Sequence, residues 1–274
     1  MTAEGGYLPV ENGRLYYEVE GDGFPLTLLH AGIATLRMWD DQVPAFAERY
    51  RVIRHDLRGF GRTTTEDATF SNRQDIADLL DHLGAERTYL LGCSRAGSIA
   101  IDFTLEFPDR VAALIPVASG LGGFQLEDPD AAPVLEEMER LWEAKAWDEL
   151  VEREVAYWVD GPGQPAGRAD ASIRDHVREW QFETYRTQTV EGQPRVLEPP
   201  AAGRLAEIRV PTLVIWGDLD EHGVAAAGER MAAEIPDARK AIMAGTAHML
   251  NMERPDEFNR LVLDFLAEVD AARA

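Results

Sequence analysis

The sequence predicts an α/β fold, a mostly parallel sheet flanked by helices, with a helical lid inserted into it. Short apolar segments alternate with amphipathic ones at both ends of the chain, a pattern typical of strand–helix–strand units. The alternation stops between residues 121 and 207, where the spacing is helical and no convincing buried strand is found. We therefore expect a core domain formed by residues 1–120 and 208–274, and a lid formed by residues 121–207.

The predicted strands are short and mostly apolar. Continuous apolar segments are expected where a parallel sheet is buried on both faces, because neither face then needs polar side chains. The predicted strands cover residues 15–19, 25–30, 51–56, 88–92, 111–118, 211–216 and 239–243.

The predicted helices separate these strands. Helical spacing indicates helices over residues 39–50, 96–107, 224–235 and 256–269, and one that carries the apolar residues Ile76, Leu79, Leu80 and Leu83. Ser71 can cap the start of this last helix, which stops near Gly84.

Composition excludes several classes of partner and of site. The 274 residues carry 27 Lys+Arg against 49 Asp+Glu, so the net charge of −22 disfavours nucleic acids and anionic membranes. A single cysteine, Cys93, excludes an internal disulfide framework and a cysteine-based zinc site. The first residues lack a signal peptide, and no apolar run approaches the roughly 20 residues that span a bilayer. We expect a cytoplasmic protein that acts on a small molecule; a homodimer is compatible with the sequence.

No cofactor is expected from the motifs. The sequence shows no metal-binding cluster, no phosphate-binding loop and no dinucleotide fingerprint. Gly59-Phe60-Gly61 lacks the third glycine and the following helix start of such a fingerprint, so we interpret it as a loop after a strand.

The strongest local feature is a serine between a predicted strand and a predicted helix. Ser94 follows the strand at 88–92, and Gly92 and Ala96 flank it two residues away on either side. A sharp strand-to-helix turn lifts such a serine above the sheet and tolerates only small residues at those two positions. Ser94 is therefore the candidate nucleophile, whereas Cys93 is expected to be an inert buried neighbour.

A serine nucleophile needs a base, and the base needs an orienting carboxylate. On this architecture the chain order is serine, acid, histidine. Asp218 and Asp220 follow the strand at 211–216, and His248 follows the strand at 239–243. Both aspartates are candidates for the acid; Asp218 could instead hold the loop as a turn residue through its side chain. His222 is more simply explained as a solvated loop residue than as a second base.

Two backbone N–H groups are the expected oxyanion donors. One belongs to Arg95, directly after the nucleophile, and the other to Gly32, or alternatively Ile33, in the loop after the strand at 25–30. The Arg95 side chain also starts beside the nucleophile. It could bind a substrate carboxylate, or it could pair with an acid of the lid or of an adjacent helix.

The lid is rich in aromatic residues. Trp142 and Trp158 are candidates for contacting the substrate, together with the Arg95 side chain. The aromatic residues of the lid could line an apolar pocket or form the lid's own small core, and both interpretations can hold for different residues.

At this point the sequence resembles the α/β-hydrolase family. The resemblance rests on five segments, at 28–33, 52–63, 90–115, 211–220 and 244–266. It is nearest to small-molecule esterases and lactonases similar to 3-oxoadipate enol-lactonases and cofactor-free haloperoxidases. The resemblance implies that Ser94 is the nucleophile, Asp220 the acid and His248 the base. Three positions depart from the family pattern: Ala96 stands where the second glycine of the serine motif is usual, Ala31 where another glycine is usual, and Arg95 where Met or Leu is common.

The function expected from these features is hydrolysis of a carboxylic ester or lactone through an acyl-enzyme on Ser94. Two alternatives remain open. One is hydrolysis of a C–C bond in a β-dicarbonyl or vinylogous acid by the same three residues. The other is a non-catalytic ligand receptor on the hydrolase fold.

Overall fold

A computed structural model describes residues 4–187, 190 and 192–273 of the chain. Its main sheet has the order β1-β2-β4-β3-β7-β8-β10-β11, with β5 paired to β2. The strands are β1 Glu4–Val10, β2 Gly13–Glu20, β3 Phe24–Leu29, β4 Tyr50–His55, β5 Thr64–Thr65, β7 Thr88–Cys93, β8 Val111–Val117, β10 Leu213–Gly217 and β11 Arg239–Met243. From β4 to β11 every neighbouring pair is parallel, whereas β1 and β2 are antiparallel additions at one edge. The predicted fold class is therefore confirmed.

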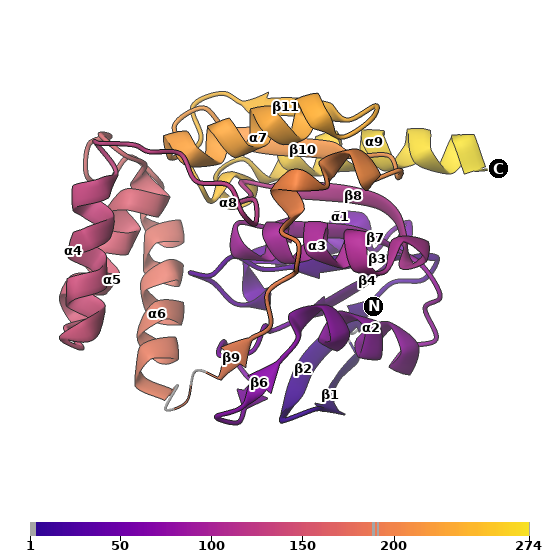
Figure 1. Cartoon of the computed structure of the whole chain (residues 1–274), viewed down its shortest axis with the longest axis horizontal. Coiled ribbons are helices and arrows are strands. Elements are labelled where there is room, and N and C mark those ends of the chain that lie inside the picture. The colour runs from indigo at the N-terminus through magenta and orange to yellow at the C-terminus, as the bar shows by residue number, and fades with distance from the viewer. Residues whose placement is uncertain (1–3, 188–189, 191, 274) are drawn as a thin grey trace.

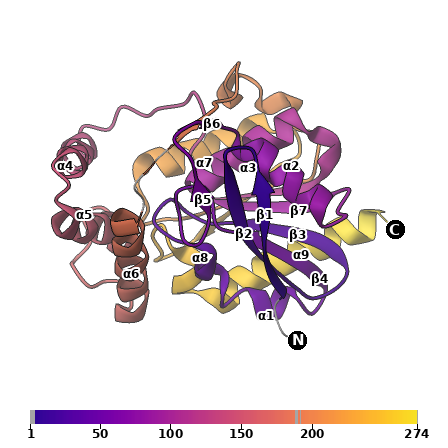
Figure 2. The ribbon, with the colours of Figure 1, turned by 90° about the horizontal axis from the view of Figure 1, so that it is seen from below.

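Helices cover both faces of this sheet. Figure 2 shows α2, α3 and α7 on one face, and α1 and α9 on the other. The core helices are α1 Val43–Phe46, α2 Asn72–His82, α3 Arg95–Glu106, α7 His222–Glu234, α8 Leu250–Glu253 and α9 Pro255–Arg273. As predicted, Ser71 caps α2 by accepting a hydrogen bond from the Gln74 amide (3.2 Å), and Gly84 follows the helix with φ of 66°.

The central strands are buried along their whole length. Every residue of β7 and of β8 is buried, as expected for the middle of a parallel sheet covered on both faces. These strands thus form a rigid base, and the loops at their carboxyl ends carry the candidate site.

A helical insert joins β8 to β10. We use this name for residues 132–187, which form α4 Ala132–Glu143, α5 Trp147–Glu154, a π-helical turn Val155–Asp160 and α6 Ala171–Thr187. In Figure 1, α4, α5 and α6 stand beside the carboxyl ends of the sheet's strands, away from α2 and from both ends of the chain. After the insert the chain returns to the core, where β9 Gln193–Pro194 pairs with β6 Thr69–Phe70 in a separate small sheet.

Two predictions of local structure need correction. The continuous helix expected over 39–50 is wrong: a 3₁₀ turn at Leu36–Trp39 and the single-turn α1 stand there, and β4 begins at Tyr50. Pro44 explains the break, because a residue without an N–H is tolerated only in the first turn of a helix. The sequence analysis also missed β1, which contains Gly5, Gly6 and Pro9, residues that are disfavoured in strands.

Neither a membrane-spanning helix nor a metal-binding cluster is found in the part of the chain that the structure describes. No helix in the described part of the chain has the length and apolarity that crossing a membrane requires. The described residues also contain no group of three or more His, Cys, Asp or Glu side chains placed to hold a metal ion.

Candidate active site

Ser94 occupies a strained turn between β7 and α3. Its backbone has φ of 58° and ψ of −121°, a region that L-residues adopt only when the surrounding structure enforces it. One restraint on this conformation is a hydrogen bond, in which the Ser94 amide donates to the Val117 carbonyl of β8 at 2.8 Å. Strain of this kind concentrates at functional sites, so the conformation supports the interpretation of a nucleophile elbow.

Small residues make this turn possible. A side chain at Gly92 would collide with the backbone carbonyl of Ala96, because β7 and the first turn of α3 approach closely there. The packing therefore requires the small residue that was expected at position 92. Cys93 is fully buried, and burial raises the pKa of its thiol, which disfavours the reactive thiolate.

His248 and Asp220 form a buried pair. The Nδ1 atom of His248 lies 2.8 and 3.0 Å from the two carboxylate oxygens of Asp220, and both side chains are almost fully buried. An ionised carboxylate can only accept hydrogen bonds, so Nδ1 carries the proton and donates it. In the neutral ring, Nε2 is then left with a lone pair and can act as a base.

The structure separates the two candidate acids. The Asp218 carboxylate accepts a hydrogen bond from the Gly245 amide at 2.6 Å, and so ties the loop after β10 to the loop after β11. Asp220 alone contacts His248. Asp218 therefore holds the loop, the role that the sequence analysis gave as its alternative.

Ser94 and His248 line one cavity of about 1050 Å³. No hydrogen bond joins their side chains among the described contacts. Catalytic hydrogen bonds of this kind are often long without substrate and tighten only when substrate binds. The arrangement is thus compatible with proton transfer from Ser94 to His248.

The turn after β3 lies against the start of α3. A Cβ atom built on Gly32 would lie 3.7 Å from the Cβ of Arg95, so the two backbone segments are neighbours beside Ser94. The Arg95 amide is at the first position of α3 and has no helical carbonyl to bond to. Two backbone N–H groups on adjacent segments are the arrangement that stabilises an oxyanion.

His30 holds this turn in place. Its Nε2 accepts a hydrogen bond from the Leu57 amide at 2.8 Å, so its Nδ1 carries the proton and donates to the Ala31 carbonyl at 2.8 Å. Burial lowers the pKa of His30 to about 4, which keeps the ring neutral and this tautomer intact. The sequence analysis did not identify this role of His30.

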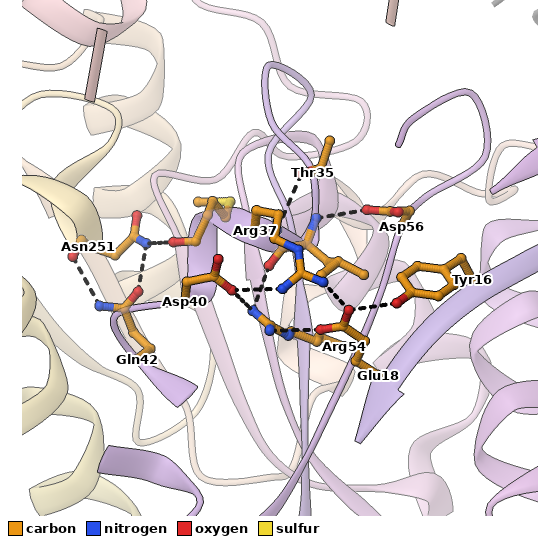
Figure 3. Close-up of polar contacts among 11 residues, drawn as sticks. Tyr16, Glu18, Thr35, Arg37, Asp40, Gln42, Arg54, Asp56 and Asn251 are labelled. Carbon is orange, nitrogen blue, oxygen red and sulfur yellow. Dashed lines mark hydrogen bonds and ion pairs between the residues drawn. The ribbon is translucent and has the colours of Figure 1, made fainter. Parts of the chain in front are cut away.

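Two polar clusters fix the segment that follows the turn (Figure 3). In the first, the Arg54 guanidinium donates to the Leu36 carbonyl at 3.1 Å and to Glu18 at 2.8 Å. In the second, the Asn251 amide donates to the Met38 carbonyl at 2.8 Å and to the Gln42 side chain at 3.0 Å. Because Asn251 lies three residues after His248, the second cluster links the histidine loop to the segment after the oxyanion turn.

The helical insert contacts the buried pair directly. The Trp158 ring lies 4.8 Å from the His248 ring, centroid to centroid, and its carbonyl accepts from the His248 amide at 3.3 Å. Gly161, with φ of 98°, closes the π-helical turn so tightly that a Cβ there would lie 2.7 Å from the Leu219 carbonyl and 3.3 Å from the Ala247 side chain. The insert therefore shapes both loops that carry Asp220 and His248.

The Arg95 side chain faces this cavity. Its guanidinium lies near Gly32 and 5.8 Å from the centre of the Phe60 ring. Two other arginines of the cavity wall are neutralised, Arg58 by Asp75 and Arg73 by Glu106. Arg95 forms no direct ion pair among the residues that the structure describes. Burial raises the pKa of Glu154, a carboxylate of the insert in the same cavity wall, and the positive charge of Arg95 opposes that rise. The sequence-based alternative of a partner acid on the lid therefore holds in part, as an interaction through space.

The aromatic residues of the insert divide between the two expected roles. Trp142 and Trp158 line the cavity, as do two residues that the sequence analysis did not single out, Trp147 and Tyr185. The rings of Trp142, Trp147 and Tyr185 lie 5.1 to 5.3 Å apart in one cluster. Tyr157, by contrast, is buried in the insert's own small core with Met138 and Leu150. Trp180 takes neither role, because it is buried in the main core.

Two carboxylates in the cavity wall were also missed. Glu154 of α5 accepts hydrogen bonds from Tyr185 at 2.6 Å and from Gln181 at 2.8 Å, and burial raises its pKa. Asp102 of α3 is the other. Neither stands out in a sequence with 49 acidic residues, because only the folded chain shows which of them face the cavity.

The chain is similar to known hydrolases along almost its whole length. The chain is 29% identical to a 2-hydroxy-6-oxononadienedioate/2-hydroxy-6-oxononatrienedioate hydrolase of Burkholderia vietnamiensis, over 94% of this chain and 93% of that one. Among solved structures, a hydrolase from Pseudomonas aeruginosa superposes with a TM-score of 0.77 at 26% identity, covering 96% of this chain and 98% of the other. The enol-lactonase of Burkholderia xenovorans gives 0.76 at 21% identity, over 96% of this chain and all of the other, which shows a shared fold.

The family is shown by a further match. A protein-family model for the alpha/beta hydrolase fold matches residues 25–255, which include the elbow, the acid loop and the histidine loop. The resemblance inferred from the five sequence segments is thereby confirmed. The chain belongs to the α/β-hydrolase fold family.

Proposed function

We propose that the protein hydrolyses a carboxylic ester or lactone of a small organic molecule through an acyl-enzyme on Ser94. One observation carries this proposal: a serine in a strained elbow shares a cavity with a histidine whose Nδ1 is bonded to a buried carboxylate. This combination converts a weakly nucleophilic hydroxyl into an effective nucleophile.

The reaction would proceed in two balanced halves. His248 takes the Ser94 proton as the oxygen attacks the carbonyl carbon, and the amides of Gly32 and Arg95 hold the oxyanion. The C–O bond then breaks, and the leaving alkoxide takes the proton from His248. In the second half, His248 deprotonates a water that attacks the acyl carbon, and Ser94 recovers its proton as the acid leaves.

The Arg95 side chain indicates which charge the substrate carries. A guanidinium that lacks an ion-pair partner in the described structure, beside the oxyanion turn, favours a substrate with a carboxylate near the scissile carbonyl. Trp142 and Trp158 would contact the apolar part of the substrate, and the helical insert would act as the lid. The cavity combines aromatic and aliphatic side chains with several charged ones, so it suits a small molecule that has both an apolar and a charged part.

Hydrolysis of a C–C bond is the second candidate. The relative from Burkholderia vietnamiensis is named for a substrate of that class, and it aligns along almost the whole chain. Such a reaction would use the same acyl-enzyme chemistry, but the leaving group is a carbon atom that must be protonated. The Arg95 guanidinium could serve this substrate equally, because the substrate in that relative's name is a dioate and carries carboxylates.

Product analysis separates the candidates. The parent enzyme is incubated with neutral and acidic esters, with lactones and with a diketone acid, and the products are identified by mass spectrometry. We expect ester or lactone hydrolysis with a pre-steady-state burst of alcohol, the sign of an accumulating acyl-enzyme. Turnover of the diketone acid alone would favour the second candidate. Ligand binding without turnover of any substrate, unchanged in Ser94→Ala, would favour a receptor.

A further inference from the structure

One face of α3 extends the cavity away from the nucleophile. Ser94, Ser98 and Asp102 recur every four residues along that face, and all three line the cavity. The rise of about 1.5 Å per residue places Asp102 roughly 12 Å along the helix axis from Ser94. The cavity is therefore long enough to hold a substrate whose far end lies well beyond the scissile bond.

Asp102 is a charged group at that far end, and Arg73 lines the cavity near it. Its Oδ1 atom is buried and has no hydrogen-bond partner among the described residues. The two nearby arginines are engaged elsewhere, Arg73 with Glu106 and Arg204 with Glu207. A buried acceptor left without a donor costs free energy in the absence of a compensating bond.

The charge of Asp102 also favours a hydrogen-bond donor as its partner. Burial raises its pKa to about 6, with the positive charge of Arg73 opposing that rise and the negative charge of Glu106 adding to it. The carboxylate is thus mostly ionised at neutral pH. Apolar side chains, Phe70, Ile99 and Val196, also line the cavity and suit the stem of a ligand better than its tip.

We propose that Asp102 forms a second binding subsite, which accepts a hydrogen bond from a hydroxyl or ammonium group at the end of the substrate remote from the scissile bond. The inference rests on the proposed function, since it places the scissile bond at Ser94. An apolar tip would leave Oδ1 unpaired, and a carboxylate tip would meet like charge. The favoured substrate is consequently a long molecule with an apolar stem and a donor at its far end.

Matched esters test this subsite. Two series are prepared, one with the tail on the acyl side and one with the tail on the alcohol side, each tail long enough to span the distance and ending in a methyl, hydroxyl or ammonium group. In at least one series, we expect the parent to prefer a donor-tipped ester over its methyl-tipped partner by about tenfold or more in kcat/KM. The stronger of the two donor arms identifies the group.

Variants of Asp102 assign the preference to this side chain. In Asp102→Leu the preference falls to about twofold or less, whereas Asp102→Asn keeps part of a hydroxyl preference and loses an ammonium preference. The exposed Asp109→Leu, outside the cavity wall, keeps the parental preference. Equal rates for all tips in the parent, or an unchanged preference in Asp102→Leu, would overturn the subsite.

A tail-free acetyl ester distinguishes this failure from failure of the proposed function. Its turnover in the parent and in both Asp102 variants shows that the Ser94 chemistry and the fold are intact. If the parent hydrolyses no ester at all, calorimetry with an ω-amino alcohol of the same length replaces the kinetic test. Binding to Ser94→Ala that weakens by about tenfold or more in Ser94→Ala/Asp102→Leu would still support the subsite, and equal binding would refute it.

Discussion

The loops of the sheet and the helical insert contribute to one cavity in different ways. Ser94, Asp220 and His248 follow the carboxyl ends of β7, β10 and β11, and both members of the Asp220–His248 pair are buried. On the insert, Trp142 faces the same cavity with 39% of its surface exposed. Residues at strand ends can be held to the accuracy that catalysis requires, whereas exposed aromatic side chains can change between related enzymes without disturbing the chemistry. The following predictions test this division of labour.

The largest effect is expected at the buried pair. Asp220→Asn should lower kcat by about 10³- to 10⁴-fold, because an amide no longer holds the His248 proton on Nδ1. Asp218→Asn is the matched control two residues earlier, and it should cost less than about tenfold because Asp218 only ties two loops together. Steady-state kinetics on one ester measures both, and similar losses in the two variants would contradict the assignment.

The junction between the two regions comes next. Gly161→Ala should lower kcat by about tenfold or more, because the added methyl group displaces the Leu219 carbonyl and the Ala247 side chain next to the buried pair. Gly163 also has a positive φ, of 70°, but nothing lies within 4 Å of its would-be Cβ, so Gly163→Ala controls for backbone strain. Equal activity in the two variants would show that the insert does not shape the site.

Arg95 tests whether the core also selects the charge of the substrate. Arg95→Gln should lower kcat/KM for an ester that carries a carboxylate by roughly tenfold, the value of one charge-assisted hydrogen bond. The neutral ester of the same size should change by no more than about twofold, since the backbone N–H remains. A loss that is equal for both esters would assign the effect to the oxyanion turn and not to the substrate carboxylate.

Trp142 tests the insert alone. Trp142→Ala should raise KM for bulky esters by roughly threefold to tenfold, because part of the aromatic wall is removed. Its kcat for an acetyl ester should stay within about twofold of the parental value. A large loss of kcat on the small ester would contradict the separation of chemistry from substrate choice.

The smallest effect is a shift in stability at Asp102. Its folded-state pKa, about 6, lies above the ordinary value, so the penalty for its charge in the folded state grows as the pH rises from about 4 to about 6. Asp102→Asn should therefore gain thermal stability over the parent at pH 7 and little at pH 4. Thermal melts at both values check this, and a gain confined to pH 4 would have the wrong sign.

Much of the core could be predicted from the sequence, because its strands are continuous apolar segments and its motifs lie at their ends. Strands β3, β4, β7, β8, β10 and β11 lie within one or two residues of their predicted positions. The errors have local causes: Pro44 breaks the expected helix, and the glycines and proline of β1 hide a strand that pairing with β2 stabilises.

The site was predictable only where spacing along the chain determines position. Ser94 and His248 could be chosen from the order of strands and loops, but two residues of one loop, Asp218 and Asp220, could be told apart only by the family resemblance or by the fold. Asp102 and Glu154 could not be selected at all, because their position in the cavity depends on the packing of α3 and α5 against distant segments. Tertiary packing decides those positions, and a single sequence does not contain it in readable form.

The central claim is that Ser94 is an activated nucleophile, and intact-mass spectrometry after incubation with a fluorophosphonate tests it most directly. The account predicts one adduct on the parent, none on Ser94→Ala, and strongly slowed labelling of Asp220→Asn. Labelling of Ser94→Ala to the same extent as the parent, or no adduct on a parent that hydrolyses esters, would contradict it.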